Sequence, residues 1–131
     1  MIGLLRGIVL QTDFRRVLLD VNGVGYNIQL PLIDLGRMVE GEEVVLFIHT
    51  HVREDALNLY GFLEEEALAV FELLISISGV GPRIGLAFLS GMLAAEIQNA
   101  IVESNVGRLT KIPWVGKKTA ERIVLELKDK V

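Results

Sequence analysis

Two short segments of the chain carry residue types that bind phosphate, and they lie 35 positions apart. Residues 77–87 read ISGVGPRIGLA and residues 112–122 read IPWVGKKTAER. A shift of 35 aligns two apolar residues, a glycine, a basic residue and a small residue of each segment: Ile77 with Ile112, Val80 with Val115, Gly81 with Gly116, Arg83 with Lys118, and Gly85 with Ala120. Apolar stretches precede and follow both segments, so the chain contains a duplicated helix–turn–helix unit.

The chemistry of such a turn is anion binding. The helix that follows each glycine begins with backbone N–H groups that have no intrahelical acceptor and carry partial positive charge. A phosphate oxygen suits these groups, and glycine lets it approach the backbone closely. The predicted phosphate-contacting residues are Gly79, Val80, Gly81 and Arg83 in the first turn and Val115, Gly116, Lys117, Lys118, Thr119 and Arg122 in the second. Contacts of this kind position DNA without reading its sequence.

Both units match the helix-hairpin-helix motif of proteins that bind DNA without sequence specificity. The alternative is an ordinary helical hairpin with glycine turns. The chain as a whole carries a net charge of −4, but residues 106–131 hold seven basic and three acidic residues. A basic end of this kind can bind a polyanion, although the same charges also fit a solvated helix face.

Other binding chemistries fit the sequence poorly. The glycines at 79, 81 and 85 miss the dinucleotide fingerprint by one position, and the run GKKT at 116–119 lacks the flanking residues of a P-loop. The chain has no cysteine, which excludes a thiolate metal site. His49 and His51 are too few to hold a metal and are expected to be structural. We therefore expect no ATP site, no metal and no cofactor.

The first 63 residues have the pattern of a small β barrel. Short runs rich in Val, Ile and Leu are separated by turn signals such as Asn22-Gly23, which suits a hairpin. The predicted strands are 2–11, 15–21, 24–30, 44–51 and 56–62. Five strands in this length fit an OB-fold barrel, and an SH3-like barrel fits the strand number equally well. We assign residues 1–63 to an OB-fold barrel.

The rest of the chain, residues 64–131, has the pattern of an all-α tandem helix-hairpin-helix domain. The predicted helices are 65–77, 82–89, 94–103, 106–112 and 117–130. Residues 73–95 are apolar over a length that could span a membrane, but Pro82 and several glycines interrupt them. We therefore expect a soluble cytoplasmic protein. Hydrophobic residues make up 51% of the chain, an excess that predicts a buried subunit interface.

Over its whole length the chain resembles the RuvA family, the Holliday-junction-binding subunits of the bacterial branch-migration machine. The matching motifs, in order, are MIGxxRG at 1–7, GVGY at 23–26, HVREDA at 51–56, LYGF at 59–62, GVGP at 79–82 and GKKTAER at 116–122. The resemblance implies a homotetramer, with an octamer as an alternative. It also implies a four-way DNA junction as ligand and RuvB, a hexameric ATP-driven motor, as partner in recombination and repair.

The resemblance also assigns a role to Glu54 and Asp55. By themselves these residues would be read as a solvated turn, whereas the family places them on an acidic pin. Four subunits would gather eight carboxylates at the centre of the junction. Their charges would repel phosphates and keep the arms apart, without making or breaking a bond.

The chain departs from the family pattern in two ways. Trp114 aligns with Gly79, where the second hairpin usually has glycine. Its ring could obstruct a phosphate, or it could lie against a partner chain or DNA. The chain also stops at Val131, whereas family members continue into a flexible linker and a third domain that binds the motor. The motor-docking domain is therefore expected to be absent from this chain.

Two other functions remain open at the level of sequence. One is a DNA repair enzyme, a nuclease or a glycosylase, that docks through its helix-hairpin-helix units. A metal nuclease needs clustered carboxylates, and the nearest candidates, at 54–55 and 64–66, lie outside the basic part of the chain. A glycosylase needs a pocket for a flipped base, which the helical part has little room to form. The other function is a structural oligomerisation module with incidental basic residues.

Overall fold

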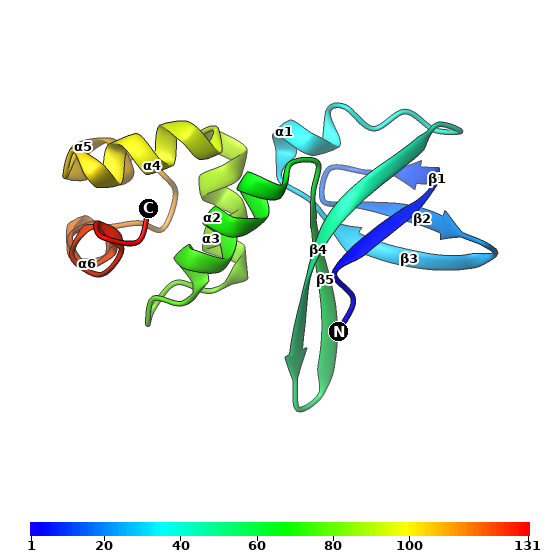
Figure 1. Cartoon of the computed structure of the whole chain (residues 1–131), viewed down its shortest axis with the longest axis horizontal. Helices are drawn as coiled ribbons and strands as arrows, with labels where there is room; N and C mark the ends of the chain where they lie inside the picture. The colour runs from blue at the N-terminus through cyan, green and yellow to red at the C-terminus, as the bar shows by residue number, and fades with distance from the viewer. The chain divides into compact units, whose positions relative to one another are not determined.

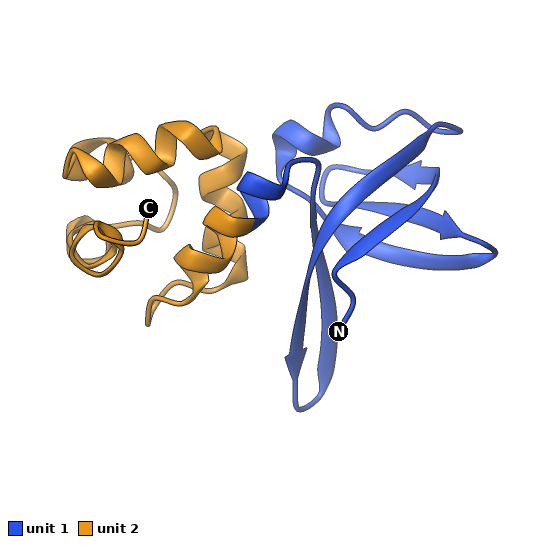
Figure 2. Cartoon of the chain, in the orientation of Figure 1, with its two compact units in different colours: residues 1–68 blue, residues 69–131 orange.

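The computed structural model describes all residues from Met1 to Val131. Two compact units make up the chain, Met1–Leu68 and Ala69–Val131, shown in different colours in Figure 2. The division falls inside helix α2 (Glu65–Ile75). The boundary predicted from the sequence, between residues 63 and 64, lies just before the same helix.

The first unit is a closed five-stranded barrel, as predicted. Its strands are β1 (Leu4–Thr12), β2 (Arg16–Val21), β3 (Val24–Gln29), β4 (Glu43–Arg53) and β5 (Ala56–Phe62). The order around the barrel is β1-β2-β3-β5-β4 (Figure 1). Neighbouring strands are antiparallel except β3 and β5, which pair in parallel at Gln29 and Tyr60. Closure leaves no free sheet edge around the barrel itself.

Alternating side chains of the strands fill the barrel. Val17 and Leu19 from β2, Ile28 from β3 and Leu46 from β4 are fully buried. Such alternation is what places every second residue of a strand on the inner face. The Asn22-Gly23 turn between β2 and β3 has positive φ at both residues, 51° and 91°. These are the values that a two-residue hairpin turn with the right twist requires, so the turn prediction is confirmed.

A short helix, α1 (Leu32–Leu35), lies between β3 and β4 and was not predicted. Pro31 precedes it in an extended conformation at the N-cap. The backbone N–H of Leu63 donates to Oδ2 of Asp34 at 3.0 Å, which ties α1 to the chain directly after β5. Burial raises the pKa of the Asp34 carboxyl above its usual range, and the Leu63 hydrogen bond opposes that rise in part.

The second unit is helical. After α2 it contains α3 (Pro82–Gly91), α4 (Ala94–Val102), α5 (Val106–Leu109) and α6 (Lys117–Leu127). Its core consists of fully buried apolar side chains from all five helices, among them Phe71, Leu74, Phe88, Ile97, Leu109 and Ile123. Helices α2 and α5 end earlier than predicted, at Ile75 and Leu109, because a turn follows each of them.

No individual helix has both the length and the apolar character needed to cross a membrane. The pair α3 and α4 meets the criterion only when taken together, and the two helices are bent by 100° at their junction.

Candidate nucleic-acid interface

The two predicted turns have the same backbone hydrogen bonds. In the first turn the N–H of Ile77 donates to the carbonyl of Leu74 at 3.1 Å, and that of Val80 to Ile77 at 3.0 Å. In the second turn the equivalent bonds run from Ile112 to Leu109 at 3.2 Å and from Val115 to Ile112 at 3.1 Å. Residues 35 positions apart thus occupy equivalent places, and the sequence repeat is also a structural repeat.

The backbone angles of the two turns agree as well. Gly79 has φ of 92° and its counterpart Trp114 has φ of 67°, so both lie in the left-handed region. Gly81 caps α3 with φ −93° and ψ 179°, and Gly116 caps α6 with φ −89° and ψ 178°. Trp114 therefore keeps the conformation that glycine adopts in the first turn, although a side chain disfavours it.

A helix with an uncapped N-terminus follows each turn. Neither Gly81 nor Gly116 provides a side-chain cap, and a Cβ built on either glycine would meet nothing within 4 Å. The first bond back to the cap comes from Gly85 in α3 and Ala120 in α6, both at 3.0 Å. The N–H groups that come before these residues have no acceptor within the helix. Two uncapped helix N-termini with nothing in front of them suit phosphate groups.

The predicted contact residues differ in their exposure and in the groups that they can present to a phosphate. Val80 and Val115 are buried, so only their backbone can face a ligand. Lys117 and Lys118 are exposed at the start of α6, and Thr119 is half-buried there. Arg122 is one turn further along α6.

Arg122 is already engaged within its own helix. Its Nε donates to Oε2 of Glu126 at 2.7 Å, in an exposed pair of the i,i+4 type. Such a pair is worth little in water, so a phosphate can compete for the guanidinium. Of the predicted basic residues, Arg122 is the one that must leave an acidic partner in order to bind DNA.

Arg83 makes a contact that the sequence did not predict. The guanidinium carbon of Arg83 lies 4.5 Å from the centre of the Trp114 ring. Arg83 belongs to the first turn and Trp114 to the second, so this cation–π contact joins the two turns. The repeat pairs Arg83 with Lys118, and nothing in the spacing of residues 83 and 114 indicates that they meet.

Gly85 lets the helices of the first hairpin pack closely. A Cβ on Gly85 would lie 2.9 Å from Cδ1 and Cε1 of Phe71 and 3.2 Å from Cγ2 of Ile75. In the second hairpin the corresponding residues are Ala120 and Val106, because a shift of 35 relates them to Gly85 and Phe71. The second hairpin thus has a larger residue, alanine, at the position of Gly85 and a smaller residue, valine, at the position of Phe71.

We expect Gly85→Ala to destabilise the second unit by about 1–3 kcal/mol, the usual cost of overpacking a core. The added methyl group collides with the Phe71 ring, which is fully buried and has little room to move. Chemical denaturation measures the loss. In a Phe71→Leu background the added cost of Gly85→Ala should be smaller. An equal cost in both backgrounds would show that the Phe71 ring does not limit this site.

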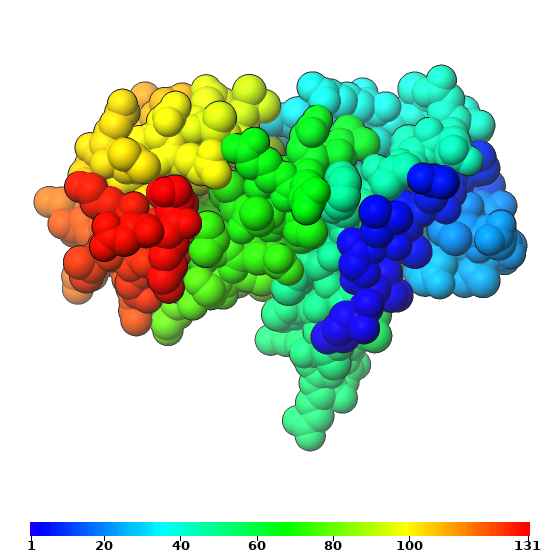
Figure 3. All heavy atoms as spheres, viewed as in Figure 1, coloured from blue at the N-terminus to red at the C-terminus, as the bar shows by residue number.

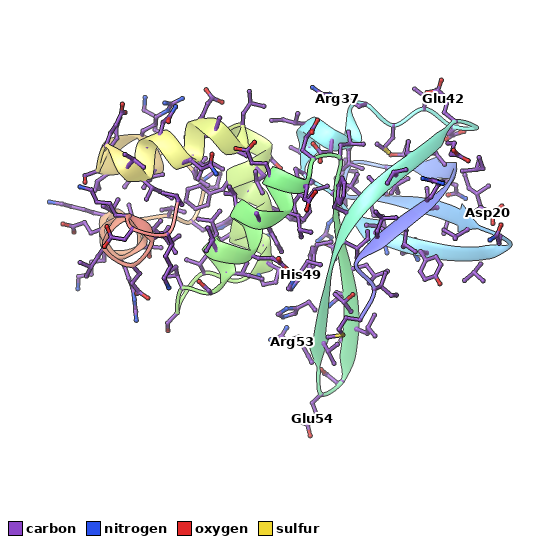
Figure 4. The ribbon with its side chains drawn as sticks, viewed as in Figure 1. Asp20, Arg37, Glu42, His49, Arg53 and Glu54 are labelled. Carbon is purple, nitrogen blue, oxygen red and sulfur yellow. The ribbon has the colours of Figure 1, made fainter.

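The acidic residues predicted as a pin lie at the tip of a long hairpin. Strands β4 and β5 pair from Phe47 and Phe62 outward to Arg53 and Ala56. Their outer part projects from the barrel (Figure 3), and Glu54 is at its end (Figure 4). Glu54 and Asp55 form the two-residue connection, and both are exposed.

Two histidines and a tyrosine form a ring cluster on the same hairpin. The ring centres of His49 and His51 are 5.9 Å apart, and those of His51 and Tyr60 are 6.3 Å apart with an edge-on arrangement. Burial raises the pKa of the Tyr60 hydroxyl. No group of three or more His, Asp or Glu side chains is arranged to hold a metal ion. The structural role expected for the histidines stays a prediction.

Comparisons with known proteins match both units. Residues 1–61 match the model of the RuvA N terminal domain, and residues 71–129 match that of the SAM-like Helix-hairpin-helix tandem. The predicted fold, a β barrel followed by a tandem helix-hairpin-helix domain, is thereby confirmed.

Curated relatives match the whole chain. A protein of Solibacter usitatus is 49% identical to it, one of Syntrophotalea carbinolica 48% and one of Shewanella halifaxensis 46%. Each is named "Holliday junction branch migration complex subunit RuvA". The match covers 100% of this chain and 67%, 66% and 64% of the three relatives, so the chain spans about two thirds of their length.

Proposed function

The chain belongs to the RuvA family, and from this premise we propose that it binds four-way DNA junctions without sequence specificity and holds them open for branch migration. The observation that carries the proposal is the structural repeat. Two uncapped helix N-termini with matching backbone angles would form two phosphate sites in one unit. Phosphate contacts made through backbone N–H groups fix the position of a duplex and ignore its base sequence.

The predicted contact residues supply these sites in two ways. The backbone of Gly79, Val80 and Gly81 and that of Val115 and Gly116 would approach phosphates directly. The side chains of Arg83, Lys117 and Lys118 would add positive charge beside them. Thr119 and Arg122 would extend the second site along the first turns of α6.

The protein's partner in this proposal is an ATP-driven motor of the RuvB type. The support is the name of the relatives, which describes a subunit of a branch migration complex. The run at 116–119 lacks the residues of a P-loop, so ATP hydrolysis is assigned to the motor and not to this chain. The proposed site of action is the bacterial cytoplasm, where the chromosome lies. The alternative of a nuclease or glycosylase receives no support from the comparisons.

Binding to DNA of different shapes tests the proposal. A mobility shift with a four-way junction and a linear duplex of the same arm sequence should show tighter binding of the junction. Both DNAs should remain intact after incubation with Mg²⁺. Equal affinity for the two DNAs would contradict junction recognition, and cleavage would favour the enzyme alternative.

We also propose that the protein is a homotetramer with fourfold symmetry. A closed ring buries apolar surface, and the exposed apolar side chains of the barrel unit include Leu4, Leu10, Val52 and Leu57. Four hairpin tips would then meet near the centre of the ring. Light scattering at micromolar concentration should give about four times the chain mass of 14.5 kDa. A particle that stays monomeric at high concentration would contradict both the ring and the shared pin.

A further inference from the structure

We propose that Trp114 is a positioning residue that holds the guanidinium of Arg83 between the two hairpins, so that their two phosphate sites act as one composite site. The inference rests on the proposed function and adds a residue to it. The sequence predicts a phosphate contact for Gly79 but none for Trp114, its counterpart in the second hairpin.

The first support is the surroundings of Arg83. This residue is the second of α3 and is exposed, and no carboxylate pairs with it. The partner that the structure provides is the indole ring, 4.5 Å from the guanidinium carbon. A flat guanidinium stacks on an aromatic face while its N–H groups remain free at the edges. The ring therefore restricts the side chain without neutralising the charge that a phosphate would meet.

The second support is the cost of having a tryptophan at this position. Trp114 has φ of 67°, a conformation that is uncommon for a bulky residue. Its side chain is 62% exposed, so core packing does not compensate for the strain. The first hairpin makes the same turn with Gly79, so the turn itself does not need a side chain. The contact with Arg83 is the interaction that this ring gains in return.

The two hairpins would therefore contribute different groups to DNA binding. The first turn has Gly79 at the position that Trp114 occupies in the second, and the side chain of its basic residue, Arg83, contacts the second turn. The second turn has the Trp114 ring at the position of Gly79, and it gathers three positive charges: those of Lys117 and Lys118 and that of the Arg83 guanidinium held by Trp114. A duplex backbone that crosses both turns would meet these cations as one group.

A double-mutant cycle tests the coupling between the two residues. The variants are Trp114→Leu, Arg83→Gln and the combination, each measured for binding to a labelled four-way junction. We expect Trp114→Leu to weaken binding about threefold in the presence of Arg83, the size of an exposed cation–π contact, and to have no further effect once Arg83 is replaced. Trp114→Phe should retain most of the affinity because it keeps an aromatic face. Leucine and phenylalanine both keep the Cβ, so backbone strain at the turn stays the same in these variants.

A second readout needs no DNA. Trp114 is the one tryptophan of the chain, so intrinsic fluorescence reports on this ring alone. Arg83→Gln should increase quenching of the free protein by acrylamide, because the ring loses its cover, whereas Arg83→Lys should have a smaller effect. Thermal unfolding followed by circular dichroism confirms that each variant is folded.

The outcomes separate the inference from the proposed function. If the wild-type protein binds no four-way junction, the proposed function is wrong and the composite site falls with it. If the junction binds but the two substitutions act additively, the inference alone is overturned. Unchanged quenching in Arg83→Gln would also overturn it, since the ring and the guanidinium would then not be in contact.

Discussion

Replacing Lys117 and Lys118 together with alanine is expected to weaken binding to every DNA, junction and duplex alike, by roughly tens of fold near 0.1 M salt. The reason is counterion release. Each phosphate that a lysine neutralises adds about 0.9 to the slope of log affinity against log salt, so the slope should fall by about 1.8 for each subunit that contacts the DNA. Both ammonium groups are exposed beside the uncapped start of α6, where a phosphate would lie.

A matched control exists at the other end of the same helix. Lys128 and Lys130 are exposed directly after α6, and Nζ of Lys128 donates to Oγ of Ser104 at 2.9 Å. Replacing this pair with alanine removes the same net charge at the end of α6 opposite to the second turn. A titration over a range of salt concentrations should leave the control slope close to that of the wild type. If the two double variants lose the same slope, the second hairpin has no special contact with phosphate.

Neutralising the hairpin tip with Glu54→Gln and Asp55→Asn is expected to lower the ratio of junction affinity to duplex affinity. Removing the negative charges lets the phosphates of an ordinary duplex approach the centre of the binding surface. Junction binding itself should not weaken. One carboxylate about 4 Å from a phosphate costs on the order of 1 kcal/mol in water. Four subunits multiply the effect, and it should be largest at low ionic strength.

The control for this variant uses the other end of β4. Glu42 and Glu43 are exposed there, far from Glu54 along the strand (Figure 4). Glu42→Gln with Glu43→Gln changes the net charge by the same amount and should leave the affinity ratio as it is. An unchanged ratio in the tip variant at low salt would mean that Glu54 and Asp55 are only a solvated turn. Loss of an activity that depends on a divalent ion would instead indicate a metal role.

Much of the barrel could be predicted because local patterns decide it. Alternating apolar residues such as Val17 and Leu19 mark an inner face, and Asn22-Gly23 specifies its turn. Helix α1 was not predicted because four residues are too few to show a helical period. Its hydrogen bond with Leu63 joins residues that are far apart in the sequence, so no local pattern indicates it. Strand β4 runs two residues further than predicted, to Arg53, because pairing with Ala56 extends it.

The equivalent geometry of the two turns could be predicted from the sequence repeat. Gly81 and Gly116 cap equivalent helices, and their shared geometry follows from the aligned sequence. The i,i+4 spacing of Arg122 and Glu126 would have indicated their ion pair. The contact of Arg83 with Trp114 had no such signal, because it depends on how two hairpins pack in space. The contact residues themselves stay predictions until DNA binding is measured.

The carboxylates at the hairpin tip also bear on aggregation. β1 pairs with β4 from Glu43 to Phe47, the residues before β1 extend these contacts to Thr50, and β3 pairs with β5 at Tyr60. Residues 52–57, at the outer end of the hairpin, pair in the sheet only with each other. Beyond the barrel, Val52 and Leu57 are cross-strand partners and both are more than half exposed. A ribbon with unpaired edges and an apolar face is a template for pairing with other copies, and charges at its end oppose that pairing. The same two carboxylates that we expect to repel DNA phosphates would thus also oppose pairing between the hairpins of DNA-free copies.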